Sequence, residues 1–328
     1  MTARLPRRAL LAAPLLAAAA LPARAQPSAW APDRPVRIVV PFPAGGSLDV
    51  QARLIAERLS PALGQLVVVD NRPGAGGTIA AAEVARAAPD GHTLLFGTNG
   101  TQAANASLFA RLPYEPVADF APVTLVTVYP QIIAVAGWPE DRSFAGLVAA
   151  LRARQEPAVY GSSGQGSPTH LAGEMAARAL GVPLVHVPYR GQAPALNDLI
   201  AGQTQLMFPS VADVLGQLRA GRVTAVAAMT PQRIALLPDV PTTAELGHPG
   251  LVSAIWGGLY ARTGSPPAAI ARLNAELRRI LDAPEVRARL EAQGFEVRPG
   301  TPEALARLQA EDTERLGALI RAAGIRVE

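Results

Sequence analysis

Short runs of β-branched residues alternate along this chain with segments of helical periodicity, and no other feature constrains its fold as strongly. Such alternation is typical of α/β proteins, because parallel strands need helical connections that return the chain to the same end of a sheet. We predict strands over Val36–Pro41, Leu66–Asp70, Thr93–Gly97, Val123–Val135, Ala158–Gly161, Leu184–Val187, Gln205–Phe208, Val223–Met229 and Gly257–Tyr260. The chain is therefore expected to form parallel α/β layers.

The segments between these runs carry signals for the start and the end of helices. An apolar stripe of helical spacing runs from Leu48 to Leu63, and Gly64 follows it where a left-handed residue commonly ends a helix. Pro266 begins another helical pattern, and Thr301 with Pro302 begins the last one. Proline suits the first turn of a helix, since an amide there has no partner within the helix.

Two apolar segments differ from the other predicted strands. Phe120–Gly137 is long for one strand and is interrupted by Pro130, and Val223–Thr230 is a second apolar run farther along the chain. If both segments cross between two lobes, the part between them is an insertion within the other lobe, and a cleft separates the two. Small ligands commonly bind in such clefts. The predicted division gives one discontinuous lobe from residues 26–128 and 229–328, and a second lobe from residues 129–228.

The first 25 residues have the layout of an export signal. A charged start ends at Arg8, an apolar stretch covers Ala9–Leu21, and Ala23–Ala25 is a small-x-small cleavage site. The apolar stretch is too short to span a bilayer. Arg7 and Arg8 also suggest the twin-arginine route as an alternative to Sec. We therefore predict a signal peptide over residues 1–25 and a periplasmic mature protein.

The charge balance argues against nucleic acid as a partner. All 30 basic residues are arginine, and the net charge of +4 equals the four arginines of the predicted leader, so the mature chain is formally neutral. Cysteine is absent, which excludes disulfides, a thiolate nucleophile and sulfur ligands for zinc. We expect no cofactor and no metal, and a mature protein that is a soluble monomer.

A first loop, residues 41–49 with the sequence PFPAGGSLD, joins a predicted strand to a predicted helix. Gly45 and Gly46 allow close approach to the backbone, and a helix that starts at Ser47 offers free N–H groups to an anion. Asp49 would repel an anion unless it braces the loop or meets a ligand ammonium group, and we favour the brace. A tight strand–helix turn without a ligand explains this segment equally well.

A second loop, residues 161–170 with the sequence GSSGQGSPTH, repeats this arrangement in the other predicted lobe. Ser167 and Pro168 form a good N-cap and first-turn pair, while Gly164 and Gly166 free the backbone. Two helix N-termini that face each other across a cleft would hold a carboxylate without lysine or arginine. The repetition favours a ligand site over two unrelated turns.

Other segments offer weaker candidates. A third loop, residues 97–109, carries Asn99 and Thr101 after a predicted strand, and such amides and hydroxyls orient ligands but more often cap loops. Phe42 and Phe208 are candidate apolar walls, although aromatic residues of this kind more often belong to a core.

Motifs for catalysis are absent or incomplete. The second loop fails the Gly-x-Ser-x-Gly pattern at Gln165, and the histidines follow no metal-binding spacing. In the dinucleotide-like segment VVVDNRPGAGGTI, Ile79 stands at the third glycine position and Asp70 precedes the glycines. A P-loop is impossible without lysine.

Several long segments of this chain occur in the same order as in the Bug receptors and resemble them. These receptors are the extracytoplasmic solute-binding proteins of tripartite tricarboxylate transporters. These segments include the first and second loops, NRPGAGGTIAAAEVARAAPDGHTLLFGTNGT, HVPYRGQAPALNDLIAGQTQLMF and LRAGRVTAVAAMTPQRIALLPDVPTTAELGHPG, and they span essentially the whole mature chain. The resemblance implies an α/β, two-lobed type II periplasmic-binding-protein fold with two crossover strands, which closes over a small carboxylate.

The resemblance also implies which residues contact the ligand. Asp213 lies where members of the family place ligand-selective residues. Members of the family often have histidine at the position of Gln102 and lysine at the position of Arg190, so no ligand contact is carried over to these two residues. The residues implied or singled out are Phe42, Ala44, Gly45, Gly46 and Asp49 of the first loop, Asn99 and Thr101 of the third, Ser162, Gly166, Ser167 and Thr169 of the second, and Phe208 and Asp213.

We thus expect a receptor, not an enzyme, that captures a small carboxylate by hinge closure and delivers it to the membrane permease of a tripartite tricarboxylate transporter. Di- and tricarboxylates, amino acids and aromatic acids are all compatible with the resemblance. One alternative is a secreted hydrolase on the same fold, with Ser162 or Ser167 as nucleophile and His170 as base. Another is a ligand-sensing subunit of a signalling system.

Overall fold

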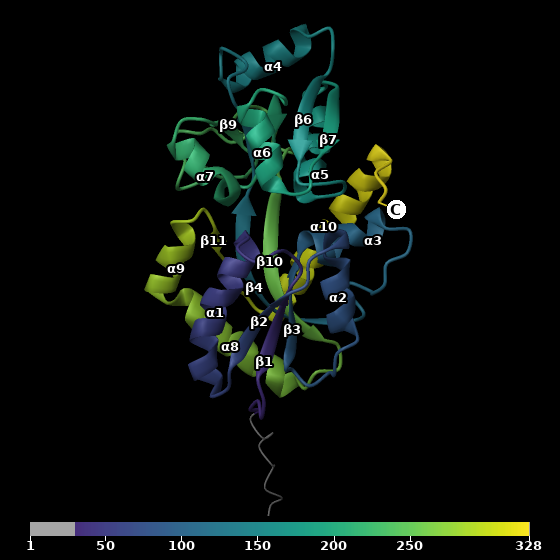
Figure 1. Ribbon diagram of the computed structural model, residues 1–328, viewed down its shortest axis with the longest axis vertical. Coiled ribbons are helices and arrows are strands. Elements are labelled where there is room, and N and C mark those ends of the chain that lie inside the picture. The colour runs from purple at the N-terminus through teal and green to yellow at the C-terminus, as the bar shows by residue number, and fades with distance from the viewer. Residues whose placement is uncertain (1–29, 328) are drawn as a thin grey trace, which may run out of the picture.

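The computed structural model describes residues 30–327, and the predicted signal peptide lies outside this range. Two lobes lie one above the other, and extended strands run between them (Figure 1). Each lobe contains one sheet with helices on its faces, so the predicted α/β class and the two-lobed type II architecture are confirmed. Among the described residues, no helix is both long enough and apolar enough to cross a membrane.

The sheet of the first lobe is mixed. Its strand order is β11-β4-β10-β3-β1-β2, with β1, β2 and β3 parallel and with β10, β4 and β11 each antiparallel to a neighbour. The expected parallel pairing holds for β1, β2 and β3, whereas β10 returns from the other lobe and pairs antiparallel with β3 and β4 without a helical crossover. The strands are β1 (Val36–Val40), β2 (Val67–Asn71), β3 (Thr93–Thr98), β4 (Phe120–Pro130), β10 (Ala254–Arg262) and β11 (Glu296–Val297).

The sheet of the second lobe is also mixed. Its order is β7-β6-β8-β5-β9, with β6 parallel to β7 and β8, and with β5 antiparallel to β8 and β9. Its strands are β5 (Ile132–Val135), β6 (Ala158–Ser162), β7 (Leu184–Pro188), β8 (Leu206–Met207) and β9 (Thr224–Ala228).

The helices begin and end close to the predicted signals. Gly64 ends α1 in the left-handed conformation, and the side chains of Ser167 and Thr301 accept the N-capping hydrogen bonds of α5 and α10. The α-helices are α1 (Ser47–Leu63), α2 (Thr78–Ala85), α3 (Asn105–Leu108), α4 (Phe144–Ala153), α5 (Pro168–Leu180), α6 (Gln192–Ile200), α7 (Val211–Arg219), α8 (Pro267–Asp282), α9 (Pro284–Glu291) and α10 (Pro302–Ala323). A 3-10 turn, η1 (Ala75–Gly77), precedes α2, and a π-helical turn, η2 (Gly100–Ala104), precedes α3.

Apolar side chains fill both faces of each sheet, and a further apolar cluster joins the lobes. In that cluster Leu171 of α5 packs with Leu316 and Ile320 of α10 and with Leu108 of α3. The second half of α10 therefore lies against the second lobe, as Figure 1 shows beside α5. This contact closes one side of the space between the lobes.

The chain passes between the sheets at two places. The first is Gln131, the single residue between β4 and β5. After β9, Met229 and Leu251 still belong to the apolar core of the second lobe, and Thr242 bridges to β9, before β10 begins in the first sheet. The division at residues 128/129 and 228/229 stays a prediction, and we propose that its second boundary lies near residue 253.

Candidate functional site between the lobes

The first loop is held in shape by Asp49. The amide of Gly45, which has a φ of +81°, donates to Asp49 Oδ2 at 2.8 Å, and Arg53 Nε donates to the same oxygen at 2.9 Å. Burial of the Asp49 carboxyl disfavours its charge, but the hydrogen bonds from Arg53 and Gly45 outweigh this and hold its pKa below the ordinary value. Asp49 therefore braces the loop, and the Gly45 amide is used within the protein.

The tip of the first loop remains accessible. Phe42, Ala44 and Gly46 are exposed, and Gly46 forms the N-cap of α1. A Cβ atom added at Gly46 would lie 3.3 Å from the carbonyl oxygen of Pro43, which is tight but within the same loop. A ligand contact by these three residues stays a prediction.

The second loop satisfies most of its own amides. Gly166 N donates to His170 Nδ1 at 2.9 Å, Ser163 N donates to Thr169 Oγ1 at 2.9 Å, and Ser167 N donates to a carbonyl of the same loop. Thr169 is buried and Ser167 is half-buried. These hydroxyls and glycines shape the loop from inside, so its amides are not free donors in this conformation.

Two stacked histidines support the second loop. The rings of His170 and His186 lie 3.7 Å apart and nearly parallel, and His186 Nε2 lies 2.6 Å from the hydroxyl of the fully buried Ser162. Burial lowers the pKa of His170 to about 3, with a further contribution from neighbouring His186, and burial lowers the pKa of His186 to about 4. His170 is therefore neutral at neutral pH and able to accept the Gly166 amide.

In the third loop, Thr101 and Asn99 have different environments. Thr101 is fully buried, and its hydroxyl accepts from Thr98 N and donates to Thr98 O, so it stabilises the end of β3. Asn99 is buried as well, and its Nδ2 donates to the carbonyl oxygen of Ala254 at 3.1 Å. Its Oδ1 is buried without a hydrogen-bond partner among the described residues. Because Nδ2 is occupied, this oxygen is left to accept a hydrogen bond from a ligand or water.

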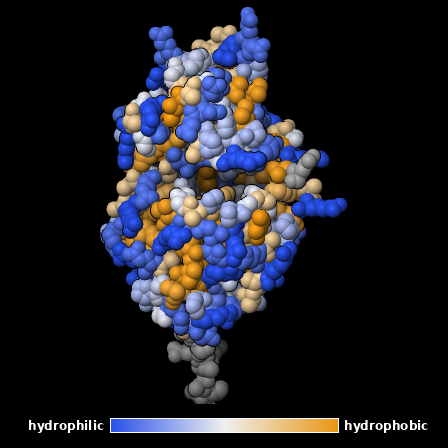
Figure 2. Space-filling model, in the orientation of Figure 1, coloured by the Kyte–Doolittle hydropathy of each residue, from blue (hydrophilic) through white to orange (hydrophobic). Residues whose placement is uncertain are grey.

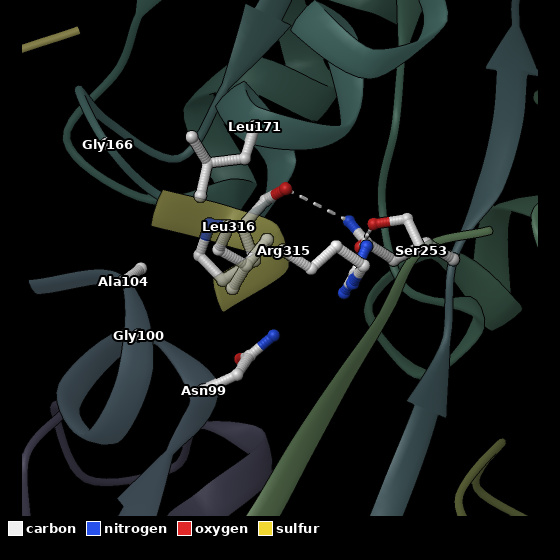
Figure 3. Close-up of a pocket in the computed structure, with 10 residues that line it drawn as sticks. Asn99, Gly100, Ala104, Gly166, Leu171, Ser253, Arg315 and Leu316 are labelled. Atoms are coloured by element: carbon white, nitrogen blue, oxygen red, sulfur yellow. Dashed lines mark hydrogen bonds between the residues drawn. The ribbon is translucent and has the colours of Figure 1, made fainter. Parts of the chain in front are cut away.

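Asn99 lines a small pocket between the lobes, which we call the interlobe pocket. Figure 3 shows the Asn99 amide extended toward this space, with Leu171 and Leu316 as apolar walls and Arg315 at one side. The Arg315 guanidinium is itself held by Asp312 Oδ1 at 2.7 Å and by the carbonyl oxygen of Val252 at 3.2 Å. The lining residues are Asn99, Gly100, Ala104, Gln131, Gly166, Pro168, Leu171, Ser253, Arg315 and Leu316.

On the other side of the crossing strands, the lobes meet through a hydrogen bond. Ser47 Oγ at the start of α1 donates to Asp213 Oδ1 at 3.1 Å, and Ser210 Oγ donates to Asp213 Oδ2 at 2.7 Å. Asp213 is exposed at the rim, and partial desolvation by the neighbouring chain raises the pKa of its carboxyl despite the two hydrogen bonds. Gly45 lines a wider space beside this contact, between α1, α7 and α9. The molecular face in Figure 2 is hollowed between the lobes.

The structure therefore divides the predicted site residues into groups. Asn99 and Gly166 line the interlobe pocket, while Gly45 and Asp213 lie at the opposite rim. Phe208 is fully buried in the core of the second lobe. Sequence reasoning missed the polar residues Gln131, Ser253 and Arg315.

Two α/β lobes that enclose a pocket lined from both sides define a solute-binding protein of the periplasmic-binding-protein class. Residues 51–325 match the family described as tripartite tricarboxylate transporter family receptor, TctC. The chain belongs to this family, as the resemblance to Bug receptors indicated.

Curated relatives cover nearly the whole chain. A protein encoded in the tcbD-tcbE intergenic region of Pseudomonas sp. strain P51 is 40% identical over 97% of this chain and 95% of its own length. Protein BugT of Bordetella pertussis is 34% identical over 90% of this chain and 91% of its own length.

Solved structures support the assignment of the chain to this family. A protein from R. palustris, described with adipate, has a TM-score of 0.83 and 35% identity over 90% of this chain and 99% of its own. MatC from Rhodopseudomonas palustris, described with bound malate, has a TM-score of 0.79 and 37% identity over 88% of this chain and 99% of its own. The periplasmic binding protein BugD has a TM-score of 0.80 and 37% identity over 90% of this chain and all of its own.

Proposed function

We propose that this protein is a periplasmic receptor that captures a small carboxylate between its lobes and delivers it to the permease of a tripartite tricarboxylate transporter. Export by the predicted signal peptide, over residues 1–25, would place the receptor in the periplasm. The protein acts by binding and not by turnover. Capture requires a hinge motion, because both lobes line the pocket that must admit the ligand.

The observation that carries this proposal is the shared lining of the interlobe pocket. Asn99 comes from the first lobe, and Gly166 and Pro168 come from the second. The unpartnered Asn99 Oδ1 favours a ligand with a hydroxyl, ammonium or protonated carboxyl group at that point, or a bridging water. The first-turn amides of α1 are further candidate donors, because they have no partner within their own helix and no side chain caps them.

A hydrolase has one observation in its favour, the 2.6 Å contact between Ser162 and His186. His170, the base expected from the sequence, instead accepts the Gly166 amide. Ser162 has no accessible surface, so a substrate carbonyl does not reach its hydroxyl in this conformation. The lowered pKa of His186, about 4, also makes it a weak base at neutral pH. The receptor is therefore the better supported function.

Calorimetric titration with adipate and with malate tests the receptor function, with 1,6-hexanediol as a neutral control of the same chain length as adipate. We expect at least one carboxylate to bind and the diol not to bind. Asn99→Leu should weaken binding, because it removes the one buried side-chain acceptor without a partner among the described residues that line the interlobe pocket. Conversion of the added carboxylate, followed by mass spectrometry, would contradict a receptor and support an enzyme.

A further inference from the structure

Gln131, the single residue between β4 and β5, connects the first crossing to two parts of the second lobe. Its Nε2 donates to the carbonyl oxygen of Phe208 at 2.8 Å and lies 3.4 Å from that of Pro168, at the start of α5. The side chain is fully buried. Gln131 thus joins the first crossing to the helix that follows the second loop.

The same residue also binds the second crossing. Ser253 Oγ donates to Gln131 Oε1 at 2.7 Å, Met229 N donates to Gln131 O at 2.9 Å, and Ser253 N donates to Met229 O at 2.9 Å. These three hydrogen bonds close a ring through Gln131, Met229 and Ser253, which we call the crossing ring. The ring holds the two crossings together on the side of the second lobe.

The sheet of the first lobe ends one residue before this ring. Its last pair along β4 and β10 is Pro130 with Ala254. Any rotation of the lobes that keeps both the sheet and the crossing ring intact must therefore use the φ and ψ torsions on either side of the Pro130–Gln131 and Ser253–Ala254 peptide bonds. Arg315 contacts Val252 O across this boundary, so opening must break or stretch that contact.

We propose that Gln131 is a positioning residue for ligand capture. Its amide makes the crossing ring, Phe208 and the start of α5 one rigid unit, so that rotation at the two hinge positions carries the second loop toward or away from Asn99. The inference rests on the proposed capture by hinge closure. It adds that Gln131 determines which parts of the second lobe move together.

The distance between the lobes provides a test that needs no ligand. The natural chain has no cysteine, so Glu57→Cys on α1 and Gln155→Cys in the second lobe introduce two unique and exposed sites for spin labels. Electron spin resonance then reports the distribution of distances between the labels in the purified protein. We expect Gln131→Leu to broaden this distribution and shift it toward longer distances, since the ring and the link to Pro168 are lost.

Asn274→Leu is the matched control. Its Nδ2 also bridges two main-chain carbonyl oxygens, those of Val123 at 2.7 Å and Gly300 at 2.8 Å, but entirely within the first lobe. A broadening in Gln131→Leu and not in Asn274→Leu supports the proposal. Unchanged distances in Gln131→Leu, or equal broadening in both variants, would overturn it. If Gln131→Leu does not fold, Ser253→Ala removes a single bond of the ring and should produce the same change to a smaller extent.

Affinity for malate and adipate forms the second arm of the experiment. Loss of a buried hydrogen bond at the hinge should weaken the binding of either probe about tenfold in Gln131→Leu. If the natural protein binds neither probe, the proposed carboxylate function is in doubt, while the distance measurement still decides the role of Gln131. Tighter or unchanged binding by Gln131→Leu, with a probe that the natural protein binds, would contradict the role in capture.

Discussion

Mild acid should destabilise the second lobe, and the stacked pair of His170 and His186 provides the reason. Both imidazoles are neutral in the folded protein, with pKa values lowered by burial to about 3 and about 4 from an ordinary 6.5. The unfolded chain therefore binds more protons than the folded chain at every pH between these values. The stability that the pair contributes is fully present above pH 6.5 and is lost as the pH falls toward 4.

The size of this loss follows from the two pKa values. Between pH 7 and pH 5, a histidine shifted to about 3 lowers the free energy of unfolding by about 2 kcal/mol. His186 is less buried than His170 and adds up to a similar amount, so the pair accounts for about 2–4 kcal/mol. Proteins of ordinary stability, about 5–15 kcal/mol, show such a change clearly in denaturant.

The assay is urea unfolding at pH 7 and pH 5, followed by tryptophan fluorescence and far-ultraviolet circular dichroism. The double variant His170→Gln, His186→Gln removes both titrating groups and should lose much less stability between the two pH values than the natural protein. The bond from the Gly166 amide to His170 Nδ1 should persist in the folded protein over this range, because His170 stays neutral until the pH approaches about 3. An equal loss of stability in the natural protein and in the double variant would refute this reasoning.

The other predictions concern the first loop and its contact with the second lobe. Gly46→Val should weaken carboxylate binding by crowding the loop tip, with little change in melting temperature, and unchanged affinity by calorimetry would count against the first loop as a ligand contact. Ser47→Ala removes the donor to Asp213, a bond worth about 1 kcal/mol, so we expect an about fivefold shift toward the open form and a larger radius of gyration in X-ray scattering; identical scattering would argue against this contact as a restraint. Asp49→Asn removes the charge that binds Gly45 and Arg53 and should lower the free energy of unfolding by about 1–2 kcal/mol in urea, whereas equal stability would show that the brace is dispensable.

Local patterns were sufficient for most of the strands and for the ends of several helices. Gly64 ends α1 because a left-handed residue is needed there, and Pro168 begins α5 because proline needs no partner in a first turn. Pro130 interrupted a run that reads as one strand, and the chain does change sheets at the next residue. Strand direction was not predictable in the same way, because the pairing of β10 with β3 and β4 depends on where the chain returns from the other lobe.

The candidate site was only partly predictable, since its decisive contacts join distant parts of the chain. Ser47 and Asp213 are separated by 166 positions, and no local pattern near either residue specifies that they meet. Gln131 did leave a signal, as a single amide inside an apolar run directly after proline. Arg315 left none, because its position depends on how α10 packs against α5.

The internal hydrogen bonding of the loops changes how recognition must work. Glycine-rich turns at two helix starts suggested a cradle of free amides, yet Gly45 donates to Asp49 and Gly166 donates to His170. Amides committed in this way fix the shape of the loops and contribute little charge to a ligand. Selectivity then depends on side chains such as Asn99 and on which groups the closing lobes bring together. A change at the hinge should therefore alter affinity as strongly as a change in the pocket lining.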